Sequence, residues 1–336
     1  MEPLTHFLTG AVLARAGFNR KSALATATMT LAAEAPDLDV LASFKGPVFG
    51  FAHHRGFTHS FVGLVLTSAV VVGLVYLIWL ARGRKTNIPN LPPRWGLLFL
   101  FAYIAGLSHI LLDFTNNYGV RPFWPFWEKW YSWDIVSIIE PTLYVLLIAP
   151  LVLPALFSRG KPLPHGRKAA ILALIAVASL YAVRDHEHRQ AVDALSRMHF
   201  NFAAPDRVSA YPYFWNVFRW YAVAETKDFY ATSDFDVDTG KLDLKELRFF
   251  HKRADTAAIL AAKRSYAGRV YLDWAQYPLV TETVSGEDSV VHFRDLRYNF
   301  PAMRGVSTLS CTVELDGNLR VVGEKFGARE QKPPLD

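Results

Sequence analysis

The chain has 336 residues, of which 51% are hydrophobic and 14% aromatic, and it carries a formal net charge of +6. Residues 1–183 contain 15 Lys and Arg against 8 Asp and Glu, a net of +7, whereas residues 184–336 contain 21 against 22, a net of −1. Because the basic excess lies in the apolar half, it argues against a nucleic-acid partner. Cys311 is the single cysteine, which excludes an intramolecular disulfide.

The chain begins with two short stretches rich in Ala, Gly and Thr, at residues 4–18 and 21–35. Small residues let helices pack closely in a membrane, so these stretches predict a helical hairpin with Asn19, Arg20 and Lys21 at its turn. Each arm is short for a full span, and a buried hairpin of the soluble type is the alternative. No basic segment precedes an apolar stretch at the N-terminus, so we expect no cleavable signal peptide.

Four apolar segments follow, at residues 61–80, 95–114, 138–157 and 167–183. The first has 20 residues without a charge, which is the length of one bilayer crossing, and the last is the shortest. We therefore predict an α-helical polytopic bundle of about four long spans, preceded by the short hairpin.

The basic residues of this half predict its orientation. Eleven of the 15 lie at the first turn or in two connections between spans: Arg15, Arg20, Lys21, Arg82, Arg84, Lys85, Arg94, Arg159, Lys161, Arg167 and Lys168. Basic residues favour the cytoplasmic face. The N-terminus, the loops 36–60 and 114–137, and the whole chain after residue 184 are then extracytoplasmic.

With this topology, the candidate metal ligands all fall on the outer face: His6, Asp37, Asp39, His54, His59, His109 and Asp113. His109 and Asp113 are four apart on a helix and project from one side of it. Asp37 and Asp39 would point the same way in an extended segment. Each pair alone is a weak signal, but ionisable groups at membrane depth are costly and need partners.

Histidine and aspartate together suit Zn best, with Mn or Fe as alternatives. Six or seven ligands exceed one tetrahedral zinc, so we expect one or two ions. Within the segment HHRGFTHS (53–60), Gly56 permits a tight loop between His54 and His59, and Thr58 or Ser60 is placed to cap the next helix.

At these residues the sequence resembles the YdjM-like bacterial inner-membrane proteins, a family to which metal-dependent hydrolase activity is ascribed. The matching segments lie within residues 1–157: THFLTG, APDLDV, HRGFTHS and GLSHILLDFTNNYGVRPFWPF. The HRGFTHS segment is the most specific. The sequence departs from the family at two positions. Ala35 stands where leucine is common, and Val40 stands where a further histidine often occurs. Because of Val40, one possible ligand of a binuclear site is missing. The ligand pattern is also similar to that of zinc-dependent phospholipases C and nucleases.

The second half predicts a soluble domain. Residues 184–200 are typical of a helix leaving the membrane, and residues 201–336 predict an α+β domain with a mainly antiparallel sheet, joined to a membrane domain of residues 1–183. VDTGKL and LDGNL are hairpin turn signals. Residues 246–265 predict a helix, and residues 269–284 and 289–300 predict strands.

Together these features predict a membrane-bound, metal-dependent hydrolase acting at the outer interface on a phosphoester of a membrane lipid or lipid-linked substrate. Arg55 would neutralise a phosphate, with a headgroup contact as the alternative. Glu140 would act as base, and a capping role is equally compatible. A structural metal in a scaffold or envelope sensor is the rival function, and ion transport ranks last because the cytoplasmic side of the spans lacks ionisable groups. The sequence leaves the oligomeric state open.

Overall fold

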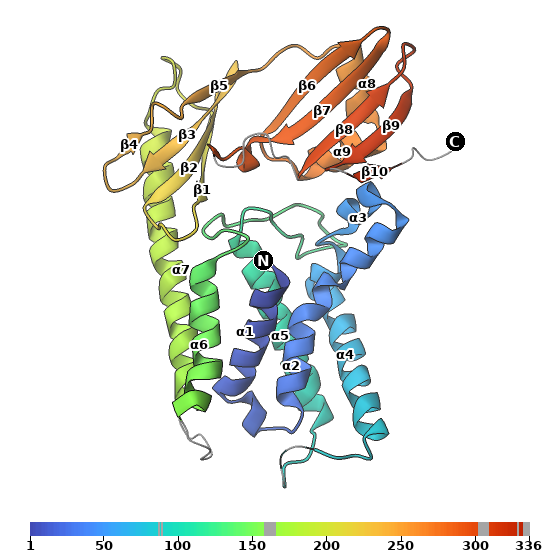
Figure 1. Ribbon diagram of the computed structural model, residues 1–336, viewed down its shortest axis with the longest axis vertical. Helices are drawn as coiled ribbons and strands as arrows, with labels where there is room; N and C mark the ends of the chain where they lie inside the picture. Colours follow the sequence, from blue (N-terminus) through green and yellow to red (C-terminus); the bar gives the residue numbers. More distant parts are fainter. Residues whose placement is uncertain (87, 89, 158–165, 302–308, 328, 332–336) are drawn as a thin grey trace. The chain divides into compact units, whose positions relative to one another are not determined.

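The protein is described by a computed structural model covering residues 1–86, 88, 90–157, 166–301, 309–327 and 329–331 (Figure 1). The described chain divides into two compact units. We call them the helical unit (Met1–Asp39, Arg55–His186 and Pro212–Val217) and the sheet unit (Val40–His54, Glu187–Tyr211 and Phe218–Asp336).

The helical unit begins with the predicted hairpin, made of α1 (Pro3–Ala16), the 3-10 turn η1 (Phe18–Arg20) and α2 (Ala25–Glu34). Glu2 caps α1, because its carboxylate accepts a hydrogen bond from the Thr5 N–H at 3.0 Å. The two arms pack without room for a side chain at Gly10, where a Cβ atom would lie 2.6 Å from the Met29 carbonyl oxygen. The small residues of the sequence therefore set the distance between these helices.

Within the part of the chain that the structure describes, three helices are long and apolar enough to cross a membrane: α4 (Phe61–Ala81), α5 (Trp95–Thr115) and α7 (Gly166–Ser196). The remaining predicted span forms α6 (Pro141–Phe157), a shorter apolar helix with Pro150 and Pro154 inside it. α7 runs without a break from the predicted last span into the predicted connecting helix. Arg159 and Lys161, used to predict orientation, lie outside the described residues.

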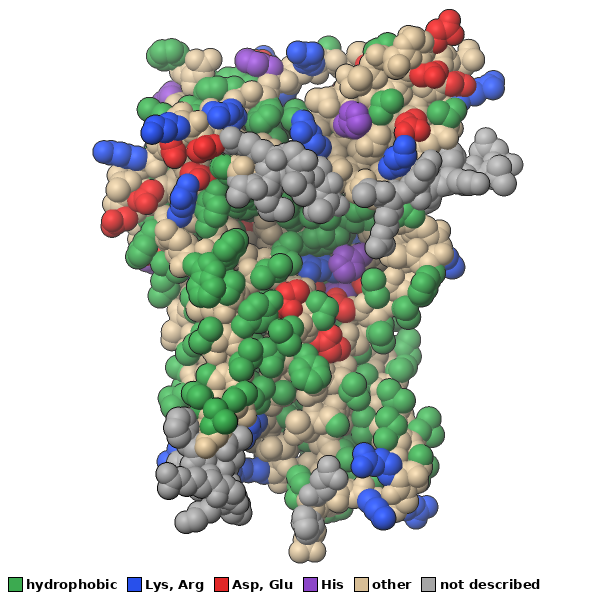
Figure 2. Space-filling model, viewed as in Figure 1, with side chains coloured by type: hydrophobic (Ala, Val, Ile, Leu, Met, Phe, Trp, Pro, Cys, Tyr) green, Lys and Arg blue, Asp and Glu red, His purple; other side chains and the backbone are tan. Residues whose placement is uncertain are grey.

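The helices run alongside one another (Figure 1), and two of the apolar clusters that they enclose are large. One cluster joins the hairpin to α4 and α5, with Met29, Val71 and Phe101 at its centre. The other joins α1 to α6 and α7 and includes Val12 and Leu147. Hydrophobic side chains also cover most of the visible flank of these helices (Figure 2). Such an outer surface is suited to lipid rather than water.

The sheet unit contains two five-stranded sheets. The first has the order β1-β2-β3-β4 with β5 also on β3, and its strands are β1 (Arg207–Pro212), β2 (Arg219–Glu225), β3 (Phe229–Asp236), β4 (Lys241–Leu242) and β5 (Arg248–His251). The second is antiparallel throughout, in the order β10-β9-β8-β7-β6, with β6 (Pro278–Ser285), β7 (Asp288–Asp295), β8 (Ser310–Leu315), β9 (Val321–Phe326) and β10 (Arg329–Gln331).

Three helices pack against the second sheet: α3 (Pro47–His53), α8 (Ala257–Arg264) and α9 (Tyr266–Trp274). The position of α3 is notable because it comes from the connection between α2 and α4, two helices of the helical unit. Its Phe51 ring lies 5.2 Å from Trp274 and 4.1 Å from Phe326, centroid to centroid. The residues from Val40 to His54 thus belong to the sheet unit, although the sequence prediction placed them with the membrane domain.

The α+β class with an antiparallel sheet is confirmed, but two element predictions within it were wrong. Residues 246–265 do not form one helix, because Arg248–His251 pair with β3 as a strand. The helix begins only where the Thr256 hydroxyl caps it by accepting from the Ile259 N–H at 3.1 Å. Residues 269–284 begin as α9 rather than as a strand, and Ser265 caps that helix in the same way.

Candidate metal centre

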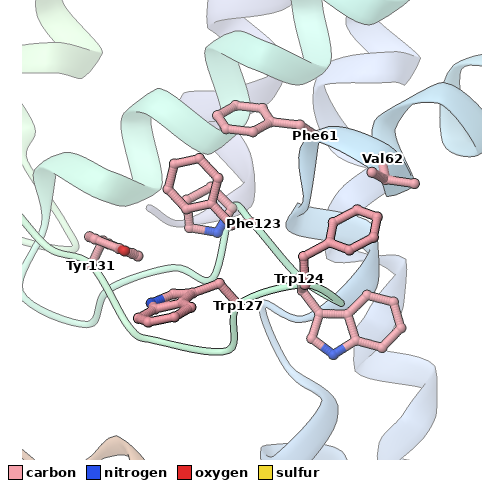
Figure 3. A pocket seen from close by; sticks show the side chains of 8 residues that line it. Phe61, Val62, Phe123, Trp124, Trp127 and Tyr131 are labelled. Carbon is pink, nitrogen blue, oxygen red and sulfur yellow. The ribbon is translucent and has the colours of Figure 1, made fainter.

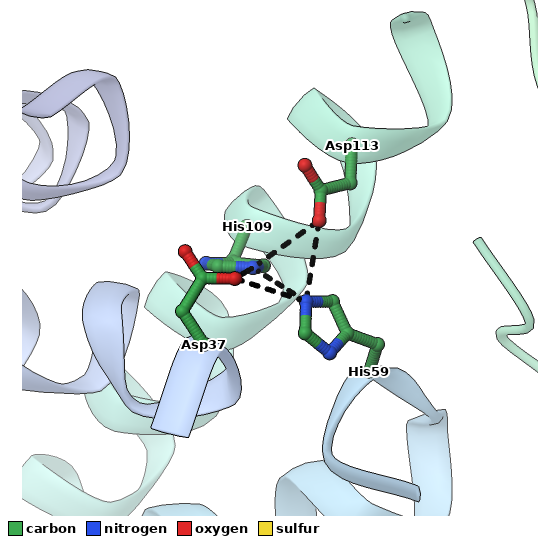
Figure 4. A group of neighbouring side chains, drawn as sticks. All are labelled: Asp37, His59, His109 and Asp113. Carbon is green, nitrogen blue, oxygen red and sulfur yellow. Dashed lines mark hydrogen bonds and ion pairs between the residues drawn. The ribbon is translucent and has the colours of Figure 1, made fainter. Parts of the chain in front are cut away.

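Four side chains converge inside the helical unit (Figure 4). His109 and Asp113 come from successive turns of α5, and His59 comes from the 3-10 turn η3 (Phe57–His59). Asp37 comes from η2 (Ala35–Lys45). One nitrogen or oxygen atom of each lies within 4.8 Å of the others. These are the ligand types that zinc accepts in proteins.

Five of the six distances between the four donor atoms are close to those expected around a tetrahedral ion, and all lie within 4.8 Å. His59 Nε2 lies 3.0 Å from His109 Nε2, 3.2 Å from Asp113 Oδ2 and 3.4 Å from Asp37 Oδ1. His109 Nε2 lies 3.3 Å from Asp113 Oδ2 and 3.5 Å from Asp37 Oδ1. Bonds of about 2.0–2.1 Å to a tetrahedral zinc place neighbouring ligand atoms about 3.3 Å apart. The four residues therefore fit a single metal ion.

Both imidazoles are oriented by acceptors on their outer side. His109 Nδ1 lies 2.6 Å from the Ala33 carbonyl oxygen, which can only accept, so Nδ1 carries a proton and Nε2 faces the other ligands. His59 Nδ1 lies 3.2 Å from Asp39 Oδ2 in the same arrangement. Outer acceptors of this kind fix the tautomer and raise the basicity of the ligating nitrogen.

Without a metal ion, the surrounding carboxylates give His59 a high proton affinity. Burial lowers the pKa of His59, but its hydrogen bonds to Asp113, Asp37 and Asp39 outweigh burial and raise the pKa to about 10. For Asp37, burial favours the neutral acid, and hydrogen bonds from His109 and His59 outweigh it, so the pKa of Asp37 is lowered. A metal must displace the proton on His59 Nε2, and its affinity is therefore expected to rise with pH.

Arg55 holds Asp113 in place. Its Nη2 lies 2.8 Å from Asp113 Oδ1, and its Nη1 donates to the Gly119 carbonyl oxygen at 3.0 Å and to Asn116 Oδ1 at 3.3 Å. The guanidinium also lies 4.6 Å from the centroid of the Tyr118 ring. Arg55 is only 3% exposed. These contacts leave Asp113 Oδ2 directed at the imidazoles of His59 and His109. They also occupy the Arg55 guanidinium, which the sequence predicted to neutralise a phosphate.

The other predicted ligands lie outside the group of four. His6 stacks on His109 with 3.6 Å between ring centroids, and its Nε2 is 3.5 Å from Asp113 Oδ1. Asp39 turns toward His59 Nδ1 and the Arg55 N–H, because η2 is a 3-10 helix and not the extended segment expected for residues 37–39. His54 directly follows α3 and belongs to the sheet unit.

Glu140, predicted to act as base, is buried in an ion pair with Arg184 of α7 at 3.0 Å. A different acid was missed. Glu34, the last residue of α2, interacts electrostatically with Asp37 and His109, and its buried Oε1 has no hydrogen-bond partner among the described residues. In the sequence, the position of Glu34 three residues before the candidate ligand Asp37 could have indicated that it belongs to the site. The Ala33 carbonyl, also missed, has no signature in sequence.

Residues 1–189 match the YdjM inner membrane protein family. The chain belongs to this family. The match covers more than half of the chain and confirms the resemblance carried by HRGFTHS. Together with the three candidate spans, YdjM membership supports a location in the inner membrane.

A curated relative matches part of the chain. It is the "Uncharacterized protein YfhP" of Bacillus subtilis (strain 168), 31% identical over 107 residues. That alignment spans 30% of this chain and 29% of the relative, so it covers less than a third of either protein. No solved structure matches the chain.

Proposed function

We propose that this YdjM-family protein is a membrane-bound, metal-dependent hydrolase. The observation that carries the proposal is the set of two imidazoles and two carboxylates at tetrahedral spacing, with both imidazoles oriented from outside. Zn suits this set best, with Mn or Fe as alternatives, and the four residues account for one ion. The chemistry that a divalent metal supplies there is the activation of water near neutral pH.

The surrounding residues have distinct parts in this reaction. Arg55 keeps Asp113 in one orientation through the carboxylate oxygen that does not face the imidazoles. Glu34, rather than Glu140, is the candidate proton acceptor, because the Glu34 carboxylate interacts with the ligands Asp37 and His109, whereas Glu140 is paired with Arg184. Asp37 is 21% exposed at its side chain while the other three ligands are fully buried, so a substrate would approach from the side of Asp37.

The proposed substrate is a phosphoester of a membrane lipid or a lipid-linked compound. His59 lies two residues before the start of the membrane helix α4, and Asp113 lies two residues before the end of α5, so the centre lies at one end of both helices. Lys and Arg side chains gather at the opposite, lower end of the helices in Figure 2. That asymmetry supports an outer-face centre and an extracytoplasmic sheet unit.

A structural metal is the second candidate, and the number of ligands favours it. Structural zinc sites have four protein ligands, whereas catalytic ones usually have three and an open position. In this case the metal would hold α5 to the loops before α4 and after α2, and the sheet unit would bind a partner.

Measurement of metal content tests whether the four residues bind a metal ion. Wild-type protein purified in detergent should hold about one Zn, Mn or Fe per chain, and His109→Ala and Asp37→Ala should lose it. His199→Ala, an exposed histidine of the sheet unit, is the matched control and should keep the metal. Folded wild type that takes up no metal on reconstitution would eliminate both candidates.

Glu34→Gln separates the two candidates. If the protein is a hydrolase, this variant should keep the metal and lose most of the turnover of phosphatidic acid or a lipid pyrophosphate, since general-base catalysis contributes about 10²–10⁴-fold. If wild type turns over neither substrate, and removal of the metal unfolds the helical unit, the structural role is the correct one.

A further inference from the structure

A second site of the helical unit is an open aromatic pocket beside the start of α4 (Figure 3). Its volume is about 430 Å³. Phe61 and Val62 of α4 form one wall, and the loop between α5 and α6 supplies the other, including Phe123, Trp124, Trp127 and Tyr131. The volume lies in the usual range for small-molecule sites, about 300–1,000 Å³.

The walls of the pocket are apolar. None of its eight lining residues carries a charge, and six of the eight are aromatic. Phe126 is 82% exposed and Trp127 is 60% exposed, which is unusual for side chains of this size in contact with water. Trp and Tyr are enriched where membrane helices meet the headgroup layer. The chemistry of the walls therefore fits a hydrocarbon ligand with its polar end near the interface.

The pocket is continuous with the lipid-facing flank of α4. Val65, Leu66 and Val70 follow Val62 along this helix and are each half-exposed or more. Only 28% of the apolar window of α4 is buried within the protein. The Phe61 N–H donates to the Pro122 carbonyl oxygen at 2.9 Å, which ties the loop to the first turn of the span. A hydrocarbon chain lying along α4 can thus enter the pocket without crossing water.

The loop that walls the pocket is held rigidly. Val120 and Tyr131 exchange two backbone hydrogen bonds of 2.9 Å, and the Arg121 guanidinium lies 4.5 Å from the Trp130 ring centroid. The Arg121 N–H donates to the carbonyl oxygen of Arg55, the residue that also holds Asp113. A pocket that is already formed binds its ligand with a smaller loss of conformational entropy.

We propose that this pocket binds one fatty acyl chain of a membrane phospholipid. The inference goes beyond the proposed function, because it concerns a site separate from the four ligands and holds whether the metal is catalytic or structural. If the protein is a hydrolase, the bound acyl chain would also hold a lipid substrate next to the loop between α5 and α6, which is hydrogen-bonded to Arg55.

The test is photolabelling in dodecyl maltoside micelles with trace phosphatidylethanolamine that carries a diazirine at the end of one acyl chain. Wild type should be labelled saturably on the peptides that contain Phe61–Val62 and Trp124–Trp127. Val62→Trp fills the pocket and should lose this labelling. Val65→Trp is the matched control, because Val65 has nearly the same exposure, 50% against 48%, and does not line the pocket. It should keep the labelling, and thermal melting confirms that both variants fold.

The inference is overturned by labelling that does not saturate, by labelling that Val62→Trp leaves intact, or by labelling of other segments only. Saturable labelling by a diazirine fatty acid but not by the phospholipid would assign the pocket to free acids and would also refute it. Labelling is measured on metal-loaded protein, and Glu34→Gln, which should keep the metal, should keep the labelling even where it loses turnover. Failure of the metal centre and failure of this inference are therefore distinguishable.

Discussion

At the scale of single residues, the candidate centre depends on partners outside the ligand set as much as on the ligands. His59 and His109 each present Nε2 to the centre because Nδ1 is engaged by Asp39 in one case and by the Ala33 carbonyl in the other. Asp113 is fixed in the same manner through its second oxygen by Arg55. Preorganisation of this kind avoids reordering the side chains when a metal binds.

Asp39→Asn tests this arrangement. The amide keeps the size of the side chain but weakens the hydrogen bond to His59 Nδ1, and loss of such an outer partner typically costs about 10- to 100-fold in metal affinity. A competition titration with a zinc chelator in detergent measures the change. Asp238→Asn, at an exposed turn of the sheet unit, should leave the affinity unchanged. Equal affinities in the two variants would mean that Asp39 does not orient His59.

Cys311 gives a pH-dependent prediction for the sheet unit. Burial raises the pKa of its thiol to about 12, and the nearby Glu324 acts in the same direction. Because the thiolate is the reactive form, folded protein at pH 8 should react very slowly with a maleimide or with Ellman's reagent. One thiol per chain should react in dodecyl sulfate. Fast labelling of folded protein would show that β8 is not packed as described.

At the scale of elements, hydrophobic length predicted the membrane helices and small residues predicted the hairpin. Apolar composition over about 20 residues is enough for α4 and α5, because in lipid a helix must satisfy its own backbone hydrogen bonds. The segments of β5 and α9 were predicted wrongly. Short segments with mixed periodicity take the secondary structure that their packing partners impose. Phe249 is in a strand because it pairs with Ala231 of β3.

The packing of α1 on α2 makes a prediction about Gly10. In Gly10→Ala the new methyl group would lie 2.6 Å from the Met29 carbonyl oxygen, and backbone cannot move aside cheaply. Overpacking of this kind costs about 1–3 kcal/mol, so the melting temperature in detergent should fall. Gly73→Ala in α4 is the matched control, since a Cβ there meets nothing within 4 Å. An unchanged melting temperature for Gly10→Ala would contradict the close approach of the helices.

At the scale of the whole molecule, the chain passes between its two units several times. The segment Val40–His54 leaves the helical unit after Asp39, contributes α3 to the sheet unit, and returns at Arg55. Asp39 and Arg55 are joined by a hydrogen bond of 2.7 Å from the Arg55 N–H. The two residues that flank the segment Val40–His54 are thus held together beside the candidate centre.

The topology gives a prediction at this scale. If the basic connections are cytoplasmic, the sheet unit lies outside the inner membrane. A C-terminal alkaline phosphatase fusion should then be active in cells, and a C-terminal green fluorescent protein fusion should be dark. A fusion of either reporter after Arg84, in the connection between α4 and α5, should give the opposite pattern. The reverse result at both positions would invert the proposed orientation.

The sequence by itself determined the membrane helices, the α+β class of the second half, the family and most of the candidate ligands. These features depend on apolar length, on turn residues, on the segment that contains His59 and on the four-residue spacing of His109 and Asp113, all of which can be read without distant contacts. The tertiary structure decided which acids belong together, because Asp37 and Asp39 are separated by the geometry of a 3-10 helix and Glu140 by its pairing with Arg184. Only the fold could bring the Ala33 carbonyl to His109, or build a pocket from Phe61 and Trp127, since neither contact follows from neighbours in the chain.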